Sequence, residues 1–239
     1  IDFHSLEQAI TSRTRGVIVV HPNNPTGNFC KSEEMRKLNE ICAAHKVAIV
    51  ADEVFLDFSQ SEKQPSTFAA NSKALTFTMS GLSKICGLPQ MKAAWLIVGG
   101  PEPRKSEALA RLEVIADTYL SMNAPIQLAM PQLLGQRQAF QKQLLARVKM
   151  NLAELDRQLA GQKFSSRLEV EGGWNTVIRV PATRSDEDLA LELLATGGVI
   201  VHPGRYYDFP HEGYLAISVI TPSASFADGI NLVLSVARP

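Results

Sequence analysis

Short hydrophobic runs alternate with stretches of helical periodicity in the first half of the chain. Each run has the length of a strand and ends in turn-forming or polar residues. The runs are Gly16–Val20, Val47–Ala51, Ala74–Met79 and Ala93–Val98. Ser32 is predicted to be the N-cap of a helix, because Glu33 and Glu34 follow it in the first turn. The runs show no clean polar alternation, so we expect a mostly parallel sheet that is covered on both faces.

Apolar residues three and four positions apart predict one long packing helix in the middle of the chain. They are Leu145, Val148, Leu152, Leu155 and Leu159. The repeat lasts about two heptads, which is short for a coiled coil. Beyond this helix, strands and helices predict a compact α+β unit. The predicted strands are Leu168–Glu171, Trp174–Val180, Val199–Val201 and Tyr214–Ile220. Ser185 is predicted to be the N-cap of one helix, and a last helix is predicted to start near Phe226.

Composition narrows the class of protein. The chain has 239 residues, with 24 Lys and Arg against 24 Asp and Glu, and 45% hydrophobic residues. This balance excludes a disordered chain and provides no basic surface for nucleic acid. No apolar run reaches the roughly 18 residues of a membrane-spanning helix. Three cysteines without a CxxC pair indicate neither a disulfide framework nor a zinc site, and we expect a cytoplasmic protein with no metal centre.

Polar residues follow three of the predicted strands: Asn24 the first, Asp52 the second and Lys84 the third. Ligands of open parallel sheets bind outside the carboxyl ends of the strands. Each residue has an ordinary structural alternative, since Asn-Pro-Thr-Gly forms turns, an Asp after a strand caps helices, and lysines are commonly exposed. Together, a lysine, a carboxylate and an amide meet the requirements of a pyridoxal phosphate (PLP) site. The lysine forms a Schiff base, and the carboxylate keeps the ring nitrogen protonated.

Other chemistries fit the sequence less well. The Ser-Lys order does not match a Walker A motif, and no GxGxxG sequence follows a strand. A hydrolase that uses Ser80 or Ser83 with Lys84 as its base is conceivable. Neighbouring residues around a tight turn rarely face each other, which argues against Ser83. Three further candidates are interpreted as surface loop residues: His202, Asp208 and His211.

Three motifs, Asn23–Gly27, Ala51–Phe55 and Ser80–Lys84, occur in this order along the chain. They are followed by Gly-Leu-Pro before Lys92, then Gly172-Gly173, His202-Pro203-Gly204 and Ile217-Ser218. In this ordered set the sequence resembles the fold-type I aminotransferases of class I/II. The resemblance implies an α/β fold, with a partial, mostly parallel large PLP-binding domain at residues 1–130, an interdomain helix at 131–160 and a small α+β domain at 161–239. It also implies transamination between an amino donor and an oxo acid.

The resemblance assigns roles by position. Lys84 would form the Schiff base and shuttle the proton during transamination. Asp52 would pair with the ring nitrogen, and Asn24 would hydrogen-bond the ring oxygen. Ser80 and Lys92 would contact the phosphate. Lys92 stands where the family usually has an arginine, so the charge is kept and the bidentate fork is lost.

Two positions depart from the family pattern. Phe55 stands where many members have a tyrosine that bonds the ring oxygen, and without this hydroxyl we expect a higher imine pKa. Ala216 stands where the substrate-carboxylate arginine lies in the family. A methyl group binds no carboxylate, so either Arg205 or Arg179 replaces the arginine or the substrate is not a standard α-amino acid. Both arginines have the alternative of being solvated surface residues.

The resemblance also implies that an N-terminal arm, several strands, a phosphate-binding loop and a ring-stacking aromatic would precede this chain. We therefore expect the chain alone to be inactive. The full-length parent is expected to be a homodimer that takes an amino acid or amine and an oxo acid, without nucleic-acid or membrane partners. Two alternatives stay open: another fold-type I PLP enzyme, such as a lyase, and a non-catalytic binding module on the same fold.

Overall fold

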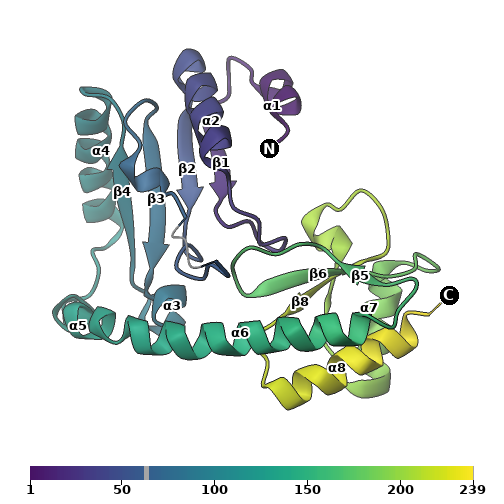
Figure 1. Cartoon of the computed structure of the whole chain (residues 1–239). Helices are drawn as coiled ribbons and strands as arrows, with labels where there is room; N and C mark the ends of the chain where they lie inside the picture. Colours follow the sequence, from purple (N-terminus) through teal and green to yellow (C-terminus); the bar gives the residue numbers. More distant parts are fainter. Residues whose placement is uncertain (62–64, 239) are drawn as a thin grey trace. The chain divides into compact units, whose positions relative to one another are not determined.

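The structure, a computed structural model, describes residues 1–61 and 65–238 and divides the chain into two compact units (Figure 1). The first unit consists of Ile1–Pro22 and Phe29–Gln141, and the second of Asn23–Asn28 and Lys142–Pro239. The division therefore falls inside a helix, and the short segment Asn23–Asn28 belongs to the second unit although the chain on either side of it belongs to the first.

The first unit contains a four-stranded sheet in the order β1-β2-β3-β4. Its strands are β1 (Gly16–Val20), β2 (Ala48–Asp52), β3 (Thr76–Gly81) and β4 (Ala94–Gly99). The first three are parallel and β4 is antiparallel to β3, which confirms the mostly parallel sheet. The helices are α1 (Phe3–Ala9), α2 (Ser32–His45), η1 (Phe68–Ala70), α3 (Leu82–Ile85), η2 (Pro89–Met91), α4 (Arg104–Tyr119), α5 (Ala124–Gly135) and the first turn of α6 (Arg137–Leu159).

One face of this sheet is well packed and the other is not. Ile49 and Ala51 of β2 are fully buried against Leu38 and Cys42 of α2. Side chains alternate between faces along a strand, so Ile18 of β1 points to the opposite face, where it is 74% exposed. The expected cover on both faces is therefore not observed among the described residues, because α4 lies against β4 without burying any of its own residues.

Helix α2 begins one residue earlier than the pattern indicated. Lys31 is the N-cap, and Ser32 is the first helical residue, so the prediction for Ser32 was wrong. The backbone N–H of Lys31 donates to Oε2 of Glu34 at 2.8 Å. A glutamate at the third helical position reaches back to the N-cap in this way, and it sets where the helix starts.

The second unit is an α+β structure with an antiparallel sheet in the order β5-β6-β8-β7. Its strands are β5 (Ser166–Arg167), β6 (Asn175–Arg179), β7 (His202–Pro203) and β8 (Tyr214–Ser218), and its helices are the rest of α6, α7 (Asp186–Gly197), η3 (Gly204–Tyr207) and α8 (Ser223–Val236). Leu155 of α6, Leu193 of α7 and Leu215 of β8 are fully buried in one core. Ser185 caps α7 as predicted, since its side chain accepts a bond from the N–H of Asp188.

Two predicted strands of this unit are wrong. The strand lies earlier, at β5, and the N–H of Leu168 makes the last bond to β6, at the carbonyl of Val177; beyond it the N–H of Glu171 donates to the carbonyl of Gly27 at 3.1 Å. Residues 199–201 form no ladder either, because the N–H of Val199 donates to the carbonyl of Leu193 and closes the C-terminal end of α7. Both segments follow the β pattern locally, but their backbone groups bond to other elements.

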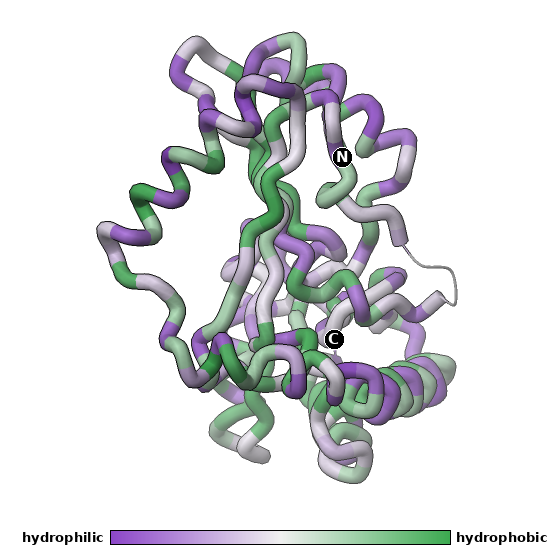
Figure 2. The backbone as a smooth tube through the Cα atoms, turned by 90° about the vertical axis from the view of Figure 1, so that its left-hand side faces the viewer, coloured by the Kyte–Doolittle hydropathy of each residue, from purple (hydrophilic) through white to green (hydrophobic). Residues whose placement is uncertain are grey.

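Hydropathy along the backbone follows these elements. Figure 2 shows long hydrophobic stretches in the central strands, whereas the helical turns alternate between hydrophobic and hydrophilic residues. Within the described residues, none of the helices combines the length and the apolar character that crossing a membrane requires. All three cysteines are buried free thiols.

Candidate active site

Asp52 closes strand β2 of the first unit. It lies opposite Met79 of β3 in the parallel register and is half-buried. Its Oδ1 accepts a bond from the N–H of Val54 at 3.1 Å, so the turn after the strand fixes the carboxylate. The sequence predicted a carboxylate at this strand end, but it gave no sign that the backbone of Val54 orients it.

A hollow of about 440 Å³ lies where β2 and β3 end and the antiparallel β4 begins. It is lined by Asp52, Val54, Met79, Ser80, Ala94, Trp95 and Leu96. The Oγ of Ser80 is buried and has no hydrogen-bond partner among the described residues. A buried hydroxyl normally finds a partner, so this one keeps hydrogen-bonding capacity for a bound group.

Lys84 lies on α3, which starts directly after β3. Leu82 anchors this short helix, since it is fully buried in a cluster with Ala93. Gly81 joins strand and helix where β4 approaches closely: a Cβ there would lie 2.8 Å from the carbonyl oxygen of Ala93. The ammonium Nζ of Lys84 lies 5.6 Å from the ring centroid of Phe55, which follows β2. The structure thus brings together two of the residues that the sequence singled out.

Glu53, next to Asp52, is a residue that the sequence analysis did not assign. It is only 4% exposed and accepts bonds from the hydroxyl of Thr67 at 2.5 Å and the N–H of Phe68 at 2.6 Å. Burial raises the pKa of Glu53, against the lowering effect of these two bonds. Its contacts tie the end of β2 to the segment before η1, and they support the turn that carries Asp52 and Phe55.

Asn24 belongs to the second unit. Its loop is closed by bonds from the N–H of Asn23 to the carbonyl of Asn28 and from the N–H of Gly27 to the carbonyl of Asn23. The Oδ1 of Asn24 accepts a bond from Nδ2 of Asn175 on β6 at 2.8 Å. The role of Asn24 toward a ring oxygen stays a prediction.

His21, in the first unit, holds the chain on either side of this loop. It is fully buried, and its Nδ1 accepts a bond from the N–H of Cys30 at 3.0 Å. Its Nε2 lies 2.9 Å from the carbonyl of Ser66, which requires the tautomer with hydrogen on Nε2. Sequence analysis gave His21 no role, because a histidine before Pro22 carries no distinctive spacing.

The remaining cationic candidates lie in different surroundings. Lys92 follows η2 with φ 51° and has an exposed side chain. Arg205 forms an ion pair with Glu187 at 3.0 Å. The guanidinium of Arg179 lies over the ring of Tyr214, 5.7 Å from its centroid. The phosphate role of Lys92 and the substrate roles of the two arginines stay predictions.

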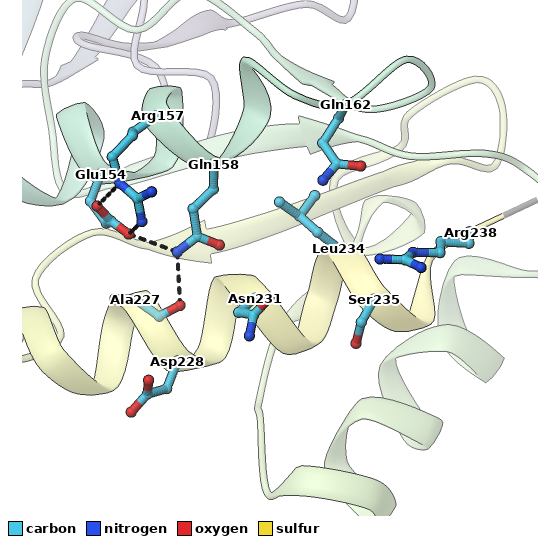
Figure 3. Close-up of a pocket in the computed structure, with 10 residues that line it drawn as sticks. All are labelled: Glu154, Arg157, Gln158, Gln162, Ala227, Asp228, Asn231, Leu234, Ser235 and Arg238. Atoms are coloured by element: carbon cyan, nitrogen blue, oxygen red, sulfur yellow. Dashed lines mark hydrogen bonds and ion pairs between the residues drawn. The ribbon is translucent and has the colours of Figure 1, made fainter.

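A second hollow, of about 410 Å³, lies between α6 and α8 of the second unit (Figure 3). Three of its polar side chains are paired on the α6 side: Arg157 bonds Glu154, and Gln158 bridges Glu154 and the carbonyl of Ala227. The bond from Gln158 to the carbonyl of Ala227 joins α6 to α8, so these side chains serve a helix–helix contact. Within the described ranges, moreover, no group of three or more His, Cys, Asp or Glu side chains could hold a metal ion.

A lysine after one strand and a carboxylate at the end of its parallel neighbour, on this sheet order, are the arrangement expected from the resemblance to fold-type I PLP enzymes. Solved structures of that class match the chain. An aminotransferase from Escherichia coli has a TM-score of 0.84 at 25% identity, covering 98% of this chain and 59% of that one. An alanine aminotransferase from Pyrococcus furiosus has a TM-score of 0.88 at 19% identity, covering 98% and 61%.

The chain belongs to the family aminotransferase class I and II, whose model matches residues 1–225. The glutamate-pyruvate aminotransferase AlaA of Escherichia coli is 31% identical over 135 residues, which are 56% of this chain and 33% of that protein. The alanine aminotransferase of Mycobacterium tuberculosis is 26% identical and covers 96% of this chain and 55% of its own length. The chain thus spans about half the length, or less, of these relatives.

Proposed function

We propose that this chain carries the cofactor-binding lysine and carboxylate of a PLP-dependent aminotransferase, which exchanges an amino group between an amino acid or amine and an oxo acid. The observation that carries the proposal is the placement of Lys84 and Asp52 at the ends of neighbouring strands, inside the family match. Membership of the family supports the reaction class, and the two motifs support the residues.

The residues of the first unit fit the cofactor. The buried hydroxyl of Ser80 is unpaired among the described residues and lies on the same hollow as Asp52. A hydroxyl of this kind suits a phosphate oxygen, and a carboxylate suits a protonated ring nitrogen. The hollow, at about 440 Å³, lies within the usual range of small-molecule sites, which is roughly 300–1,000 Å³.

In this proposal each residue has a distinct task. Nζ of Lys84 would hold the cofactor and would take and return the proton at the substrate α-carbon. The carboxylate of Asp52 keeps a proton on the ring nitrogen, and the hydroxyl of Ser80 and the ammonium of Lys92 bind the phosphate. Bound PLP would supply an electron sink for this proton transfer. The apolar ring of Phe55 lies beside Lys84 and contributes no hydroxyl.

The proposal extends to the setting of the protein. We expect a cytoplasmic homodimer with small-molecule substrates and without nucleic-acid or membrane partners. The balanced charge supports this expectation, since 24 cationic and 24 acidic residues form no net basic surface. Sedimentation of the full-length protein at several concentrations would measure the oligomeric state, and a monomer would contradict the dimer.

The central test is covalent trapping. The full-length protein is incubated with PLP, reduced with borohydride and mapped by peptide mass, and we expect the adduct on Lys84. Lys84→Ala should lose the adduct, whereas exposed Lys73→Ala should keep it. An adduct spread over surface lysines, or none, would sink the proposal. With an amino acid and an oxo acid added, exchange of the amino group is expected; release of ammonia without a new amino acid would indicate a lyase.

A further inference from the structure

Helix α3, which carries Lys84, is a single turn of four residues. One turn of helix does not stabilise itself in water, so its orientation depends on contacts with the rest of the first unit. Leu82 supplies such a contact at the start of the helix, where it is fully buried. The other end carries carbonyl groups that the helix itself leaves without partners. The groups that bond to these carbonyls therefore help to decide where Lys84 points.

Gln141 bonds to the last of these carbonyls. It lies near the start of α6, in the part of that helix that belongs to the first unit. Its Nε2 donates to the carbonyl of Ile85, the residue after Lys84, at 3.1 Å. The same Nε2 donates to Oδ2 of Asp57 at 2.8 Å. A carbonyl and an ionised carboxylate only accept, so both partners require the amide nitrogen of Gln141, and not its oxygen, to face them.

Asp57 lies in the turn that carries Phe55. The N–H of Phe58 donates to the carbonyl of Phe55 at 2.9 Å, which closes the chain around Asp57. The rings of Phe55 and Phe58 meet edge to face at 6.5 Å, and both are buried. The carboxylate of Asp57 therefore belongs to a well-packed segment. Gln141 thus joins the two segments whose side chains, Lys84 and Phe55, meet at the candidate site.

Phe140, which precedes Gln141, supports the same end of α3 by van der Waals contact. A Cβ on Gly87, just after the helix, would lie 2.6 Å from Cε2 of the Phe140 ring, so the ring packs directly on the backbone there. The start of α6 therefore contacts the end of α3 through two consecutive side chains, one apolar and one polar (Figure 1).

We propose that Gln141 is a positioning residue for Lys84. The inference rests on the proposed function, in which Nζ of Lys84 would hold the cofactor and move the substrate proton. The bridge from Ile85 to Asp57 fixes α3 against the turn and restricts the directions open to Nζ. Proton transfer needs the base within hydrogen-bond reach of the proton, and a helix that rocks holds that geometry for less of the time. A bond to a carboxylate is stronger than one between neutral groups, which suits this task.

The first test leaves PLP out. Lysines of the full-length apoprotein are labelled briefly with acetic anhydride, and peptide mass mapping gives the labelling rate of Lys84 relative to that of exposed Lys73. Gln141→Leu keeps the bulk of the side chain and removes both bonds, so the ratio should rise by about 3- to 10-fold as Lys84 is released. Gln143→Leu, at an exposed position of the same helix, should leave the ratio unchanged. An unchanged or lower ratio in Gln141→Leu would overturn the inference.

A charge exchange separates the bridge from packing. In Gln141→Glu a carboxylate faces the carboxylate of Asp57, so the labelling ratio should rise at least as much as in Gln141→Leu. Adding Asp57→Asn to this variant supplies an amide that can donate to the carboxylate at position 141, and part of the rise should be reversed. A double variant that labels like Gln141→Glu alone would overturn the role of the bridge. This comparison holds even where Gln141→Leu fails to fold.

With PLP bound, the reaction supplies an independent measurement. Gln141→Leu should lower kcat for amino-group exchange by about 3- to 10-fold and leave KM for the amino acid within about 2-fold, because the proposed task of Lys84 is proton transfer. A loss that lies in KM alone would overturn the inference. If the wild-type protein forms no adduct on Lys84, the proposed function fails, and the labelling ratio still decides whether Gln141 positions Lys84.

Discussion

The ammonium Nζ of Lys84 lies 5.6 Å from the centroid of the Phe55 ring, within the range of a cation–π contact. The lysine comes from α3, just after β3, and the phenylalanine from the turn after β2. Because β2 and β3 pair in parallel, the two segments that follow them emerge at the same edge of the sheet. The pairing of these strands therefore determines which side chain the lysine meets.

Phe55→Tyr should change the proton affinity of the site without disturbing its packing. A hydroxyl near Lys84 would bond the cofactor oxygen and favour the deprotonated form of the linkage between Lys84 and PLP. We expect the pKa of that linkage to fall by roughly one unit, the equivalent of one ordinary hydrogen bond. A pH titration of the visible absorbance measures it. An unchanged or higher pKa would contradict the proposed geometry, and Phe58→Tyr serves as the control.

Asp52→Asn should keep the fold and lose the carboxylate that we propose as the partner of the ring nitrogen. The amide oxygen can still accept the bond from the N–H of Val54, so the turn is preserved. Loss of a carboxylate beside a cationic ring nitrogen lowers its pKa by roughly 1–3 units. The half-reaction with an amino acid should slow by about 10- to 10³-fold. Asp208→Asn, at an exposed αL position of the second unit, is the matched control. A wild-type rate in Asp52→Asn would remove Asp52 from the site.

The sequence was sufficient to place Asp52 at the end of a strand and Lys84 shortly after the next one, because the apolar runs before them fold as β2 and β3. The same local pattern failed at residues 199–201, whose backbone closes the end of α7 instead of joining the sheet. Long-range pairing also could not be predicted. Neither the bond of His202 to Tyr207 nor its position opposite Ala216 follows from spacing, since both depend on how two strands align.

The burial of Glu53 could not be predicted from the sequence either. It adjoins Asp52 in the sequence, yet Asp52 faces the hollow while Glu53 is enclosed by Thr67 and Phe68. The segment that encloses it lies fourteen and fifteen residues further on. A local pattern predicts alternating directions along a strand end, but it does not predict which loop folds back to cover one of them.

Gly27→Ala should destabilise the second unit selectively. Gly27 has φ +73°, and a Cβ there would lie 2.3 Å from Cγ2 of Val170 and 2.6 Å from the carbonyl of Gly172. Strain and overpacking together should lower the free energy of unfolding by about 2–4 kcal/mol. Gly161→Ala, where a Cβ would meet nothing within 4 Å, should change it by less than about 0.5 kcal/mol. Urea unfolding of both variants measures the difference, and equal stabilities would contradict the packing of this loop.

Glu53→Gln tests the buried carboxyl through the pH dependence of stability. Burial raises the pKa of Glu53 above its ordinary value of 4.5, so the folded chain binds this proton more tightly than the unfolded chain. Its stabilisation is complete below pH 4.5 and is lost as the pH rises through the folded pKa. Glutamine does not titrate, so the variant should gain stability relative to wild type as the pH rises toward neutral. Glu33→Gln should show the opposite trend, because Arg36 lowers the pKa of Glu33. Urea unfolding gives both differences, the one for Glu33 below pH 4.5 and the one for Glu53 above it, and parallel curves for the two variants would exclude a raised pKa for Glu53.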